Sequence, residues 1–505
     1  MLTWAAVTPV YENARRAPFI LAAAIISGVI YAALATLPDL RRALTLYLVL
    51  HAVLAVLMLL TWRRLRRQAG AMGIVLVGAL LFRLVAALGA PTLSDDVYRY
   101  VWDGRVQLSG HHPYAHAPVA PVLSDLRDDD WSRINHPELK TIYPPLAQIF
   151  FLVLAATGSG VVGIKLALGL LDFAVVLLLA RLLARRRLPA DRVVLYAWNP
   201  LAVMETAGSG HVEPLGALLV LVSVVALIPG AAPREDGPSP DRGWRGLISP
   251  LALAGAIHAK LLPVALLPAR LLRSDTRRRF WTLAALVALA LPYALTGPVL
   301  GGGLFAYAER WEYNAFAFAG LRESLEWLDL GPGLKAWLVG LEASWGVSWL
   351  PWEFLQDHVW PPELARGLML LFGALWILAL LRARPEPGRE ALLVLGGLLL
   401  LMPTFHPWYM LWVLPLAAAY LSPGFLYLGL ALPLAYTGSE HDVSWLVRCV
   451  EYLPTFSLFA WTAARIRKAD ATRRASGILS RHVEPAATDP RSSGRDHTPG
   501  GAPGA

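Results

Sequence analysis

The chain has 505 residues, of which 56% are hydrophobic and only 16% are charged, and its mean hydropathy is +0.50. Soluble domains are about 45–50% apolar and about 25% charged, so this composition excludes a water-soluble protein and indicates that the bilayer is its main solvent. The net charge of +9 does not indicate nucleic-acid binding, because the basic residues stand in short groups between apolar segments. The single cysteine, Cys449, excludes an internal disulfide, and no Cys/His cluster indicates a zinc site.

Apolar segments long enough to span a membrane occur along the whole chain, since a spanning helix needs about 20 such residues. The longer ones are 18–37, 43–61, 71–90, 212–229, 247–268, 281–300, 363–382 and 445–465. Shorter ones are 391–404, 408–421 and 424–438. We therefore expect an all-α polytopic membrane protein of about 12 to 14 transmembrane helices. The first apolar segment is expected to be a retained anchor rather than a cleaved signal peptide.

The region between residues 144 and 210 leaves two alternatives. If 144–158, 161–181 and 193–208 all span, the total is about 14 helices, and the basic group 185–187 lies outside, against the positive-inside rule. If the first and third segments are re-entrant or interfacial, the total is about 12 and the charges fit the rule. The sequence leaves both arrangements open.

Basic residues beside the apolar segments predict the orientation of the chain. Counting from either end places segments 91–143 and 301–362 and His406 outside the cytoplasm. The integral membrane domain is expected over 1–466, with 91–143 and 301–362 as its large outer loops. From 467 to 505 the chain is rich in Ser, Pro, Gly, Arg and Asp and has no apolar period, which predicts a disordered basic cytoplasmic tail.

The first outer loop opens with two adjacent carboxylates, Asp95 and Asp96, directly after a membrane helix. Read as a helix, this segment places four residues on one face: Asp96, Arg99, Tyr100 and Asp103. Ser94 can cap such a helix, and acidic residues are favourable in its first turn. Capping explains one acidic residue but not two. A partly desolvated carboxylate held beside arginine is a candidate general base, with Asp95 expected to pair with Arg99 one turn away.

Two other groups follow in the same loop. Gly110-His111-His112-Pro113-Tyr114 predicts a turn, and its two histidines are an alternative metal site, although adjacent imidazoles seldom converge on one ion. Further on, Asn135-His136-Pro137-Glu138 leads to Tyr143-Pro144-Pro145-Leu146, where the chain re-enters the membrane. Consecutive prolines suit the start of a helix, where the first N–H groups have no partners.

Polar residues within the apolar segments are the next candidates, because they are costly in a membrane and usually functional. Glu205 and the run Gly208-Ser209-Gly210-His211-Val212-Glu213 lie close together in sequence. Lys260 lies inside the expected helix 247–268, where it either meets an anion or cavity or extends its ammonium group to the interface. His406-Pro407-Trp408-Tyr409 falls on the predicted side of Asp95 and Asp96.

Taken in order, these motifs resemble the GT-C superfamily of membrane glycosyltransferases. Within that superfamily they are most similar to bacterial α-mannosyltransferases that use polyprenyl-phosphate mannose. The resemblance runs from about residue 70 to 425. It is carried by the outer aspartate, Gly-x-x-Pro-Tyr, Tyr-Pro-Pro-Leu, Trp-Asn-Pro-Leu, Gly-Ser-Gly-His-Val-Glu, Lys-Leu-Leu-Pro and His-Pro-Trp-Tyr. Counting back along the chain from Gly110, the first residue of Gly-x-x-Pro-Tyr, places the acidic residue of the family pattern at Asp96. Some relatives have Asp-x-Asp, whereas here Ser94 occupies the first acidic position and Asp95 the middle one.

The resemblance implies transfer of a sugar, with mannose expected, from a polyprenyl-phosphate donor to an extracytoplasmic glycan or lipid-linked acceptor, with inversion. The lipid phosphate is its own leaving group, so no nucleotide fold is needed. Asp96 is expected to be the general base, with Asp95 supporting it. Fixed positive or hydrogen-bonding groups would stabilise the departing phosphate. The residues expected to bind substrate are Arg99, Tyr100, Asp103, Tyr143, His211, Lys260, His406 and Tyr409.

No cofactor is expected to be required, although a divalent cation at Asp95 and Asp96 is conceivable because hard cations favour carboxylate oxygens. The resemblance implies a multi-pass protein of the bacterial inner membrane with an extracytoplasmic active site. Two other readings stay open. One is a GT-C enzyme that uses another polyprenyl-phosphate sugar, such as arabinose or glucose. The other is a transporter or flippase in which Asp96, Glu205 and Lys260 line a pathway.

Overall fold

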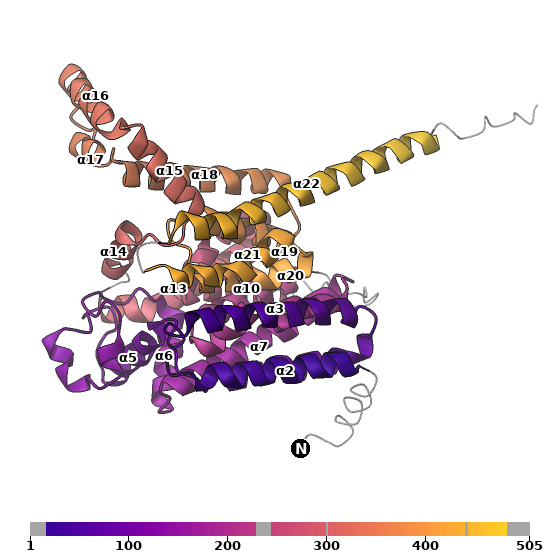
Figure 1. Cartoon of the computed structure of the whole chain (residues 1–505). Coiled ribbons are helices and arrows are strands. Elements are labelled where there is room, and N and C mark those ends of the chain that lie inside the picture. The colour runs from indigo at the N-terminus through magenta and orange to yellow at the C-terminus, as the bar shows by residue number, and fades with distance from the viewer. Residues whose placement is uncertain (1–16, 229–243, 299–300, 440–442, 482–505) are drawn as a thin grey trace, which may run out of the picture. The chain divides into compact units, whose positions relative to one another are not determined.

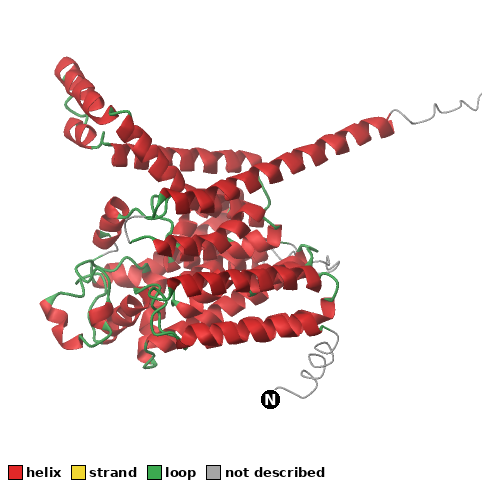
Figure 2. Ribbon diagram, in the orientation of Figure 1, coloured by secondary structure: helices red, strands yellow, loops and turns green. Residues whose placement is uncertain are grey.

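The computed structural model describes residues 17–228, 244–298, 301–439 and 443–481. The structure is 77% helical, and the described residues contain no strand (Figure 2). The expected all-α membrane fold is confirmed. The chain divides into two compact units, Met1–Phe456 and Ser457–Ala505.

Five helices in the described part of the chain are long and apolar enough to cross a membrane. They are α2 (Pro18–Thr36), α3 (Leu44–Leu65), α7 (Val161–Arg185), α13 (Thr276–Thr296) and α18 (Pro361–Ala383). Shorter apolar helices are α4 (Met72–Ala86), α6 (Pro145–Ala156), α10 (Glu213–Leu227) and the segment Pro423–Thr437, which comprises α21 (Pro423–Ala431) and η10 (Leu432–Thr437). The total of 12 to 14 spans stays a prediction.

Helices α2 and α3 show how the apolar sequence is divided between lipid and protein. They lie side by side at the N-terminal edge of the first unit (Figure 1). Each buries one row of side chains, including Tyr31 and Tyr47, and leaves another row of aliphatic residues exposed, including Val29 and Val56. Exposed aliphatic side chains on a helix of spanning length indicate contact with lipid tails.

The single helix expected over 247–268 is wrong. Helix α11 (Ile248–Ala259) ends at Lys260, which has an extended backbone, and η8 (Leu262–Leu266) and α12 (Leu267–Arg273) follow. Pro263 lacks an N–H group and disfavours helical geometry in the residue before it. The break places Lys260 at a helix end rather than within a continuous helix.

Two other apolar segments are interrupted by short turns. Segment 193–208 consists of short pieces: η5 (Ala190–Val193), α8 (Val194–Ala197), α9 (Pro200–Val203) and the π-helical turn η6 (Met204–Gly208). Segment 408–421 is likewise divided into η9 (Pro407–Trp412) and α20 (Leu414–Tyr420). Neither is the single helix that its apolar run suggested. Residues 193–214 and 407–419 are buried, and irregular backbone is tolerated at membrane depth where protein surrounds it.

The remaining elements form the outer segments and the C-terminal part. They are α5 (Asp96–Leu108), η3 (Pro121–Leu126), η4 (Trp131–Arg133), α14 (Gly302–Arg310), α15 (Phe316–Trp327), α16 (Leu330–Trp345), α17 (Trp352–Asp357), α19 (Pro387–Leu401) and α22 (Trp445–Arg481), with the short turns η2 (Ala69–Ala71) and η7 (Trp244–Leu247). Helix α22 includes 467–481, a stretch rich in the strong helix formers Ala and Arg, and the disordered tail expected over 467–505 stays a prediction. The rest of the expected tail, 482–505, lies outside the described residues.

Candidate active site

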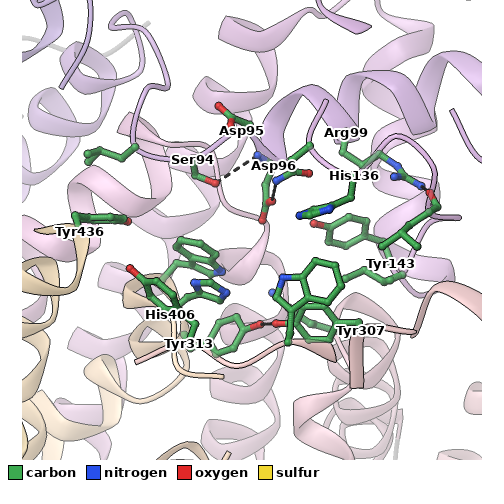
Figure 3. A pocket seen from close by; sticks show the side chains of 18 of the residues that line it. Ser94, Asp95, Asp96, Arg99, His136, Tyr143, Tyr307, Tyr313, His406 and Tyr436 are labelled. Carbon is green, nitrogen blue, oxygen red and sulfur yellow. Dashed lines mark hydrogen bonds between the residues drawn. The ribbon is translucent and has the colours of Figure 1, made fainter. Parts of the chain in front are cut away.

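A cavity of about 410 Å³ lies at the start of α5 (Figure 3). Its lining includes residues from both expected outer loops, from the end of α11 and from the segment before η9. The expected site residues that line it are Asp95, Asp96, Arg99, Tyr143, Lys260, His406 and Tyr409. The structure therefore brings together segments that are far apart in sequence, including the two loops and the His406 segment that charge patterning had assigned to one side of the membrane.

Asp96 is the first residue of α5, as the helical reading of this segment predicted. The Oγ atom of Ser94 accepts a hydrogen bond from the Asp96 backbone N–H at 3.3 Å, and Asp95 occupies the N-cap position. A carboxylate in the first turn is favoured by the helix dipole. The Asp96 side chain is 20% exposed, so it is held by the protein yet reaches the cavity.

Both carboxylate oxygens of Asp96 have neighbours. The Oδ1 atom accepts a hydrogen bond from Asn135 Nδ2 at 3.3 Å, and Oδ2 lies 3.6 Å from His211 Nδ1. On the other side of the His211 ring, Nε2 lies 3.4 Å from Glu205 Oε2. Tyr436 donates a hydrogen bond of 2.8 Å to the other oxygen of Glu205. His211 therefore lies between two carboxylates, behind the cavity wall.

These contacts set the charges of the pair. Burial raises the pKa of Asp96, but contact with His211, the positive charges of His211 and Lys260, and the Asn135 hydrogen bond together hold that pKa well below its usual range. Burial lowers the pKa of His211, but its contacts with Asp96 and Glu205 outweigh burial and raise the pKa to about 9. At neutral pH the site therefore contains an imidazolium between two carboxylates.

Further along the expected polar face of α5, the side chains of Arg99 and Asp103 contact other parts of the protein. Arg99 donates to Asp103 Oδ1 at 2.9 Å and to the Leu139 carbonyl at 3.0 Å. Asp103 is buried and also accepts a hydrogen bond from Gln148 at 2.8 Å. It does not line the cavity, and its contacts hold Arg99 in place.

Tyr100, on the same face, is also buried away from the cavity. Its ring stacks on Phe151 with centroids 4.7 Å apart, and its exposed fraction is 0%. Tyr100, Asp103 and His211 do not line the cavity in this structure, because helical spacing predicts a shared face but not what covers it. The substrate contacts expected of these three residues stay predictions.

Lys260 reaches the cavity from the break after α11. Its ammonium group forms an ion pair with Glu213 and lies 4.7 Å from the ring centroid of Tyr409. The Tyr409 hydroxyl in turn lies 2.6 Å from that of Tyr307. The lysine therefore meets a carboxylate at the cavity wall, which favours the alternative in which Lys260 meets an anion or cavity.

His406 belongs to a column of stacked rings. Its ring lies against Trp408 at 4.2 Å and against Tyr313 at 4.5 Å, and Trp408 continues the column to His211 at 3.9 Å. Burial lowers the pKa of His406 to about 3; nearby Asp96 opposes this, whereas the charges of Lys260 and His211 add to it. His406 is therefore neutral at physiological pH and can meet an anion only as a hydrogen-bond donor.

Several lining residues were not among the expected site residues. They include Asn135, the cationic side chains of Arg41 and Lys140, and a set of aromatic or imidazole side chains: His136, Tyr307, Trp311, Tyr313, Trp408 and Tyr436. His136 packs edge-on against Trp311 with centroids 4.7 Å apart. One signal in the sequence could have indicated some of them, since Asn135, His136 and Trp408 lie within the motifs quoted above. The partners from α14 and the segment after it carry no such pattern.

No group of three or more His, Cys, Asp or Glu side chains in the described part of the chain could hold a metal ion. His112 contacts the Tyr293 carbonyl through Nε2 at 3.1 Å, and the His111 ring meets that of His116 edge-on. Asp96 faces an imidazolium and an amide donor, which fit a carboxylate without a metal. A divalent cation at Asp95 and Asp96 stays a prediction.

The fold and site define a membrane-embedded helical protein with an ionised carboxylate and a lysine on one cavity wall. Residues 19–269, close to half of the chain, match the family described as alpha-(1->6)-mannopyranosyltransferase, N-terminal domain. The chain is also 26% identical over 306 residues to a probable alpha-(1->6)-mannopyranosyltransferase of Mycolicibacterium smegmatis (strain ATCC 700084 / mc(2)155), covering 48% of this chain and 55% of the relative. The chain thus spans about half the length of that curated relative. No solved structure matches it.

These similarities confirm the resemblance to GT-C-like mannosyltransferases that the motifs predicted. The matched region contains Asp95, Asp96, His211 and Lys260. His406 and Tyr409 lie beyond it, so their place in the site rests on the structure alone.

Proposed function

We propose that this protein is a membrane glycosyltransferase that moves mannose from a polyprenyl-phosphate donor to an extracytoplasmic glycan or lipid-linked acceptor. The observation that carries the proposal is the Asp96 carboxylate, which is held ionised at a cavity that cationic side chains also line, among them Lys260 and Arg99. The family matched by residues 19–269 supports mannose as the transferred sugar. A cavity of this size lies within the usual range of about 300–1,000 Å³ for small-molecule sites.

The proposed reaction is a single displacement at the anomeric carbon. The acceptor hydroxyl attacks that carbon while Asp96 takes the hydroxyl proton. A new carbon–oxygen bond forms as the bond to the phosphate oxygen breaks, and the lipid phosphate leaves with the electron pair. Attack opposite to the leaving group inverts the anomeric configuration.

Positive groups on the cavity wall fit the departing phosphate. Lys260 is already fixed by Glu213 and Tyr409, so its charge needs little reorganisation when negative charge develops. Arg99 lines the same cavity and is oriented by Asp103. His406 adds a neutral hydrogen-bond donor.

Donor binding also bears on the strength of the base. A carboxylate with a low pKa is a weak base in the empty site. An anionic phosphate beside Lys260 would offset the positive charge that lowers the Asp96 pKa. Asp96 would then become more basic when the donor is bound, which couples proton abstraction to the presence of the leaving group.

The membrane setting fits a lipid-linked donor. The cavity opens where outer segments meet the ends of apolar helices, so a polyprenyl tail could remain among lipids while its phosphate reaches the wall. We place the protein in the bacterial inner membrane with this cavity on the extracytoplasmic side. The positions of the basic residues support that orientation.

The test is transfer by the purified full-length chain in proteoliposomes that contain labelled polyprenyl-phosphate mannose and mannan-type acceptors. We expect release of polyprenyl phosphate together with labelled, α-linked product. The same assay with polyprenyl-phosphate arabinose or glucose tests the other sugars. Absence of transfer from all three donors, with movement of intact donor between leaflets instead, would favour the transporter reading and overturn the proposal.

A further inference from the structure

Behind Asp96 lies a short series of polar side chains that reaches away from the cavity. His211 contacts Asp96 through Nδ1 and Glu205 through Nε2, and the side chains of His211 and Glu205 are both 0% exposed. Tyr436 holds the far oxygen of Glu205 by a hydrogen bond of 2.8 Å. Burying a carboxylate and an imidazole this completely is costly unless their charges compensate each other.

The backbone of this region is built to bring His211 to Asp96. The π-helical turn η6 carries Glu205, and the His211 N–H donates to the Glu205 carbonyl at 3.1 Å. Gly210 has a φ of +83°, and a Cβ there would lie 3.0 Å from Val97 Cγ2. A larger residue would therefore push the loop away from α5 beside Asp96. Single π-turns within helices occur often at functional sites.

The orientation of the His211 ring is fixed from a third direction. Trp408 stacks on it at 3.9 Å with an interplanar angle of 16°. Stacking fixes the plane of the imidazole, and the two carboxylates fix its rotation within that plane. The ring therefore presents Nδ1 to Asp96 in one arrangement.

We propose that His211, held by Glu205, is a positioning residue that fixes the Asp96 carboxylate in one orientation and supplies the positive charge beside it. This inference rests on the proposed function, because Asp96 is the base only if the protein transfers a sugar. Neither His211 nor Glu205 lines the cavity, so they act through Asp96 rather than on the substrate.

The pH dependence follows from the charged and titratable groups around the ring. They are Asp96 on α5, Glu205 on η6, Glu213 on α10, Lys165 on α7, Lys260 after α11 and His406 before η9. Glu213 is paired with Lys260, and the ammonium group of Lys165 donates to the Gly89 carbonyl. Asp96 and Glu205 are therefore the groups that determine the charge of His211.

The raised pKa of His211, about 9, predicts the alkaline limit of activity. The imidazolium is present below this pH and is lost as the pH rises through it, so kcat/KM should fall above about pH 9. Glu205→Gln removes one of the two carboxylates that raise the pKa, so the alkaline limit should move to lower pH. His211→Gln removes the cation that lowers the Asp96 pKa, so the acid limit should move to higher pH.

The experiment measures the pH profile of kcat/KM for release of polyprenyl phosphate by the full-length wild type and three variants. For His211→Gln we expect kcat to fall by up to about a hundredfold, since residues in one ion-pair network couple by about 0.5–3 kcal/mol, with little change in donor KM. Glu205→Asp keeps the charge and should keep the alkaline limit near that of the wild type. If Glu205→Gln fails to fold, Glu205→Asp still provides the pH profile of a variant at this position.

Glu390→Gln is the matched control. Glu390 is a buried carboxylate that pairs with Arg270 and Arg273, and neither it nor those partners line the cavity. Its removal should leave both pH limits in place, whatever it does to stability. Wild-type activity that depends on Asp96, combined with unmoved limits in His211→Gln or Glu205→Gln, would overturn this inference and leave the proposed function standing. Absence of sugar transfer by the wild type would overturn both.

Discussion

This protein contains two neighbouring clusters of buried charged residues. Two adjacent residues of the turn η6, Glu205 and Thr206, belong to different clusters. Glu205 faces His211 and Asp96, whereas the Thr206 hydroxyl lies 3.5 Å from Asp172 Oδ2. In the second cluster, Arg83 meets the same oxygen of Asp172 through two nitrogens, at 2.6 and 2.7 Å. Both clusters contain a carboxylate and a cation within a membrane protein, yet they differ in geometry and access.

The cluster at Asp172 is closed. The side chains of Arg83 and Asp172 are 1% and 0% exposed, and Arg83 also donates to the carbonyls of Ala79 and Ala197. Tyr196 donates to the other oxygen of Asp172. Short contacts on every side leave this carboxylate no capacity for a substrate, which indicates a structural role.

The cluster at Asp96 is open on one side. Its ionic contacts are longer, 3.4 and 3.6 Å, and the Asp96 side chain retains contact with the cavity. An oxygen with one neighbour still has a free lone pair, so Asp96 can accept a proton without breaking its existing contacts. A buried charge thus suggests a functional site when its contacts leave one direction free, and burial alone does not distinguish the two clusters.

The largest effect that distinguishes the clusters should come from Asp96→Asn. This change keeps the size of the side chain and removes the basic carboxylate. General base catalysis is worth about 10²–10⁴-fold, so turnover of labelled donor should fall by that factor. Donor binding should change little, because an anionic phosphate gains nothing from a nearby carboxylate. Near-normal transfer by the variant would exclude Asp96 as the base.

Asp172→Asn should have the opposite signature. It leaves Arg83 as a buried cation without its counter-charge, which typically costs about 3–5 kcal/mol of stability. We expect a strong loss in denaturant unfolding in detergent, with near-normal turnover per folded molecule. The double variant Arg83→Met with Asp172→Leu removes both charges and should recover much of the loss. A folded single variant that lost turnover as severely as Asp96→Asn would mean that the closed cluster takes part in the reaction.

The contrast between the clusters also shows how far the sequence could lead. Long apolar runs predicted α2, α3, α7 and α18 because lipid-facing helices need only length and composition. The interruptions at Lys260 and within 193–208 depend on which protein surfaces cover the released backbone groups. That cover comes from distant elements, so local composition could not predict it.

The same limit applies to the site. Helical spacing correctly put Asp96 and Arg99 near one another, and the motif register selected Asp96 for the site. Neither helical spacing nor the motif register could show that Asp103 would be buried away from the cavity, or that Glu205 would contact the same histidine as Asp96. Those contacts join η6 to α5 across more than a hundred residues and require a π-turn that has no clear sequence signal.

A smaller effect is expected from Lys260→Gln, which tests the cation that lines the same cavity. A charge-assisted hydrogen bond contributes about 1.5–3 kcal/mol, so kcat/KM for the donor should fall roughly tenfold to a hundredfold. Lys165→Gln is the matched control, because this buried lysine donates to the Gly89 carbonyl and does not line the cavity. Equal losses in the two variants would mean that a general loss of stability, rather than phosphate binding, explains the effect.

The smallest effect should come from Asp95→Asn, although Asp95 lines the same cavity and directly precedes Asp96. Its place at the start of α5 favours a negative charge through the helix dipole, a contribution of about 0.3–1 kcal/mol, so turnover should fall less than about tenfold.

A divalent cation shared by Asp95 and Asp96 would predict a larger effect of Asp95→Asn, since the loss of either ligand would then reduce turnover severely. Turnover measured in EDTA separates the two cases, and we expect the wild type to be unaffected. Activity abolished by EDTA and restored by magnesium or manganese, with Asp95→Asn as damaging as Asp96→Asn, would replace the metal-free base with a metal site.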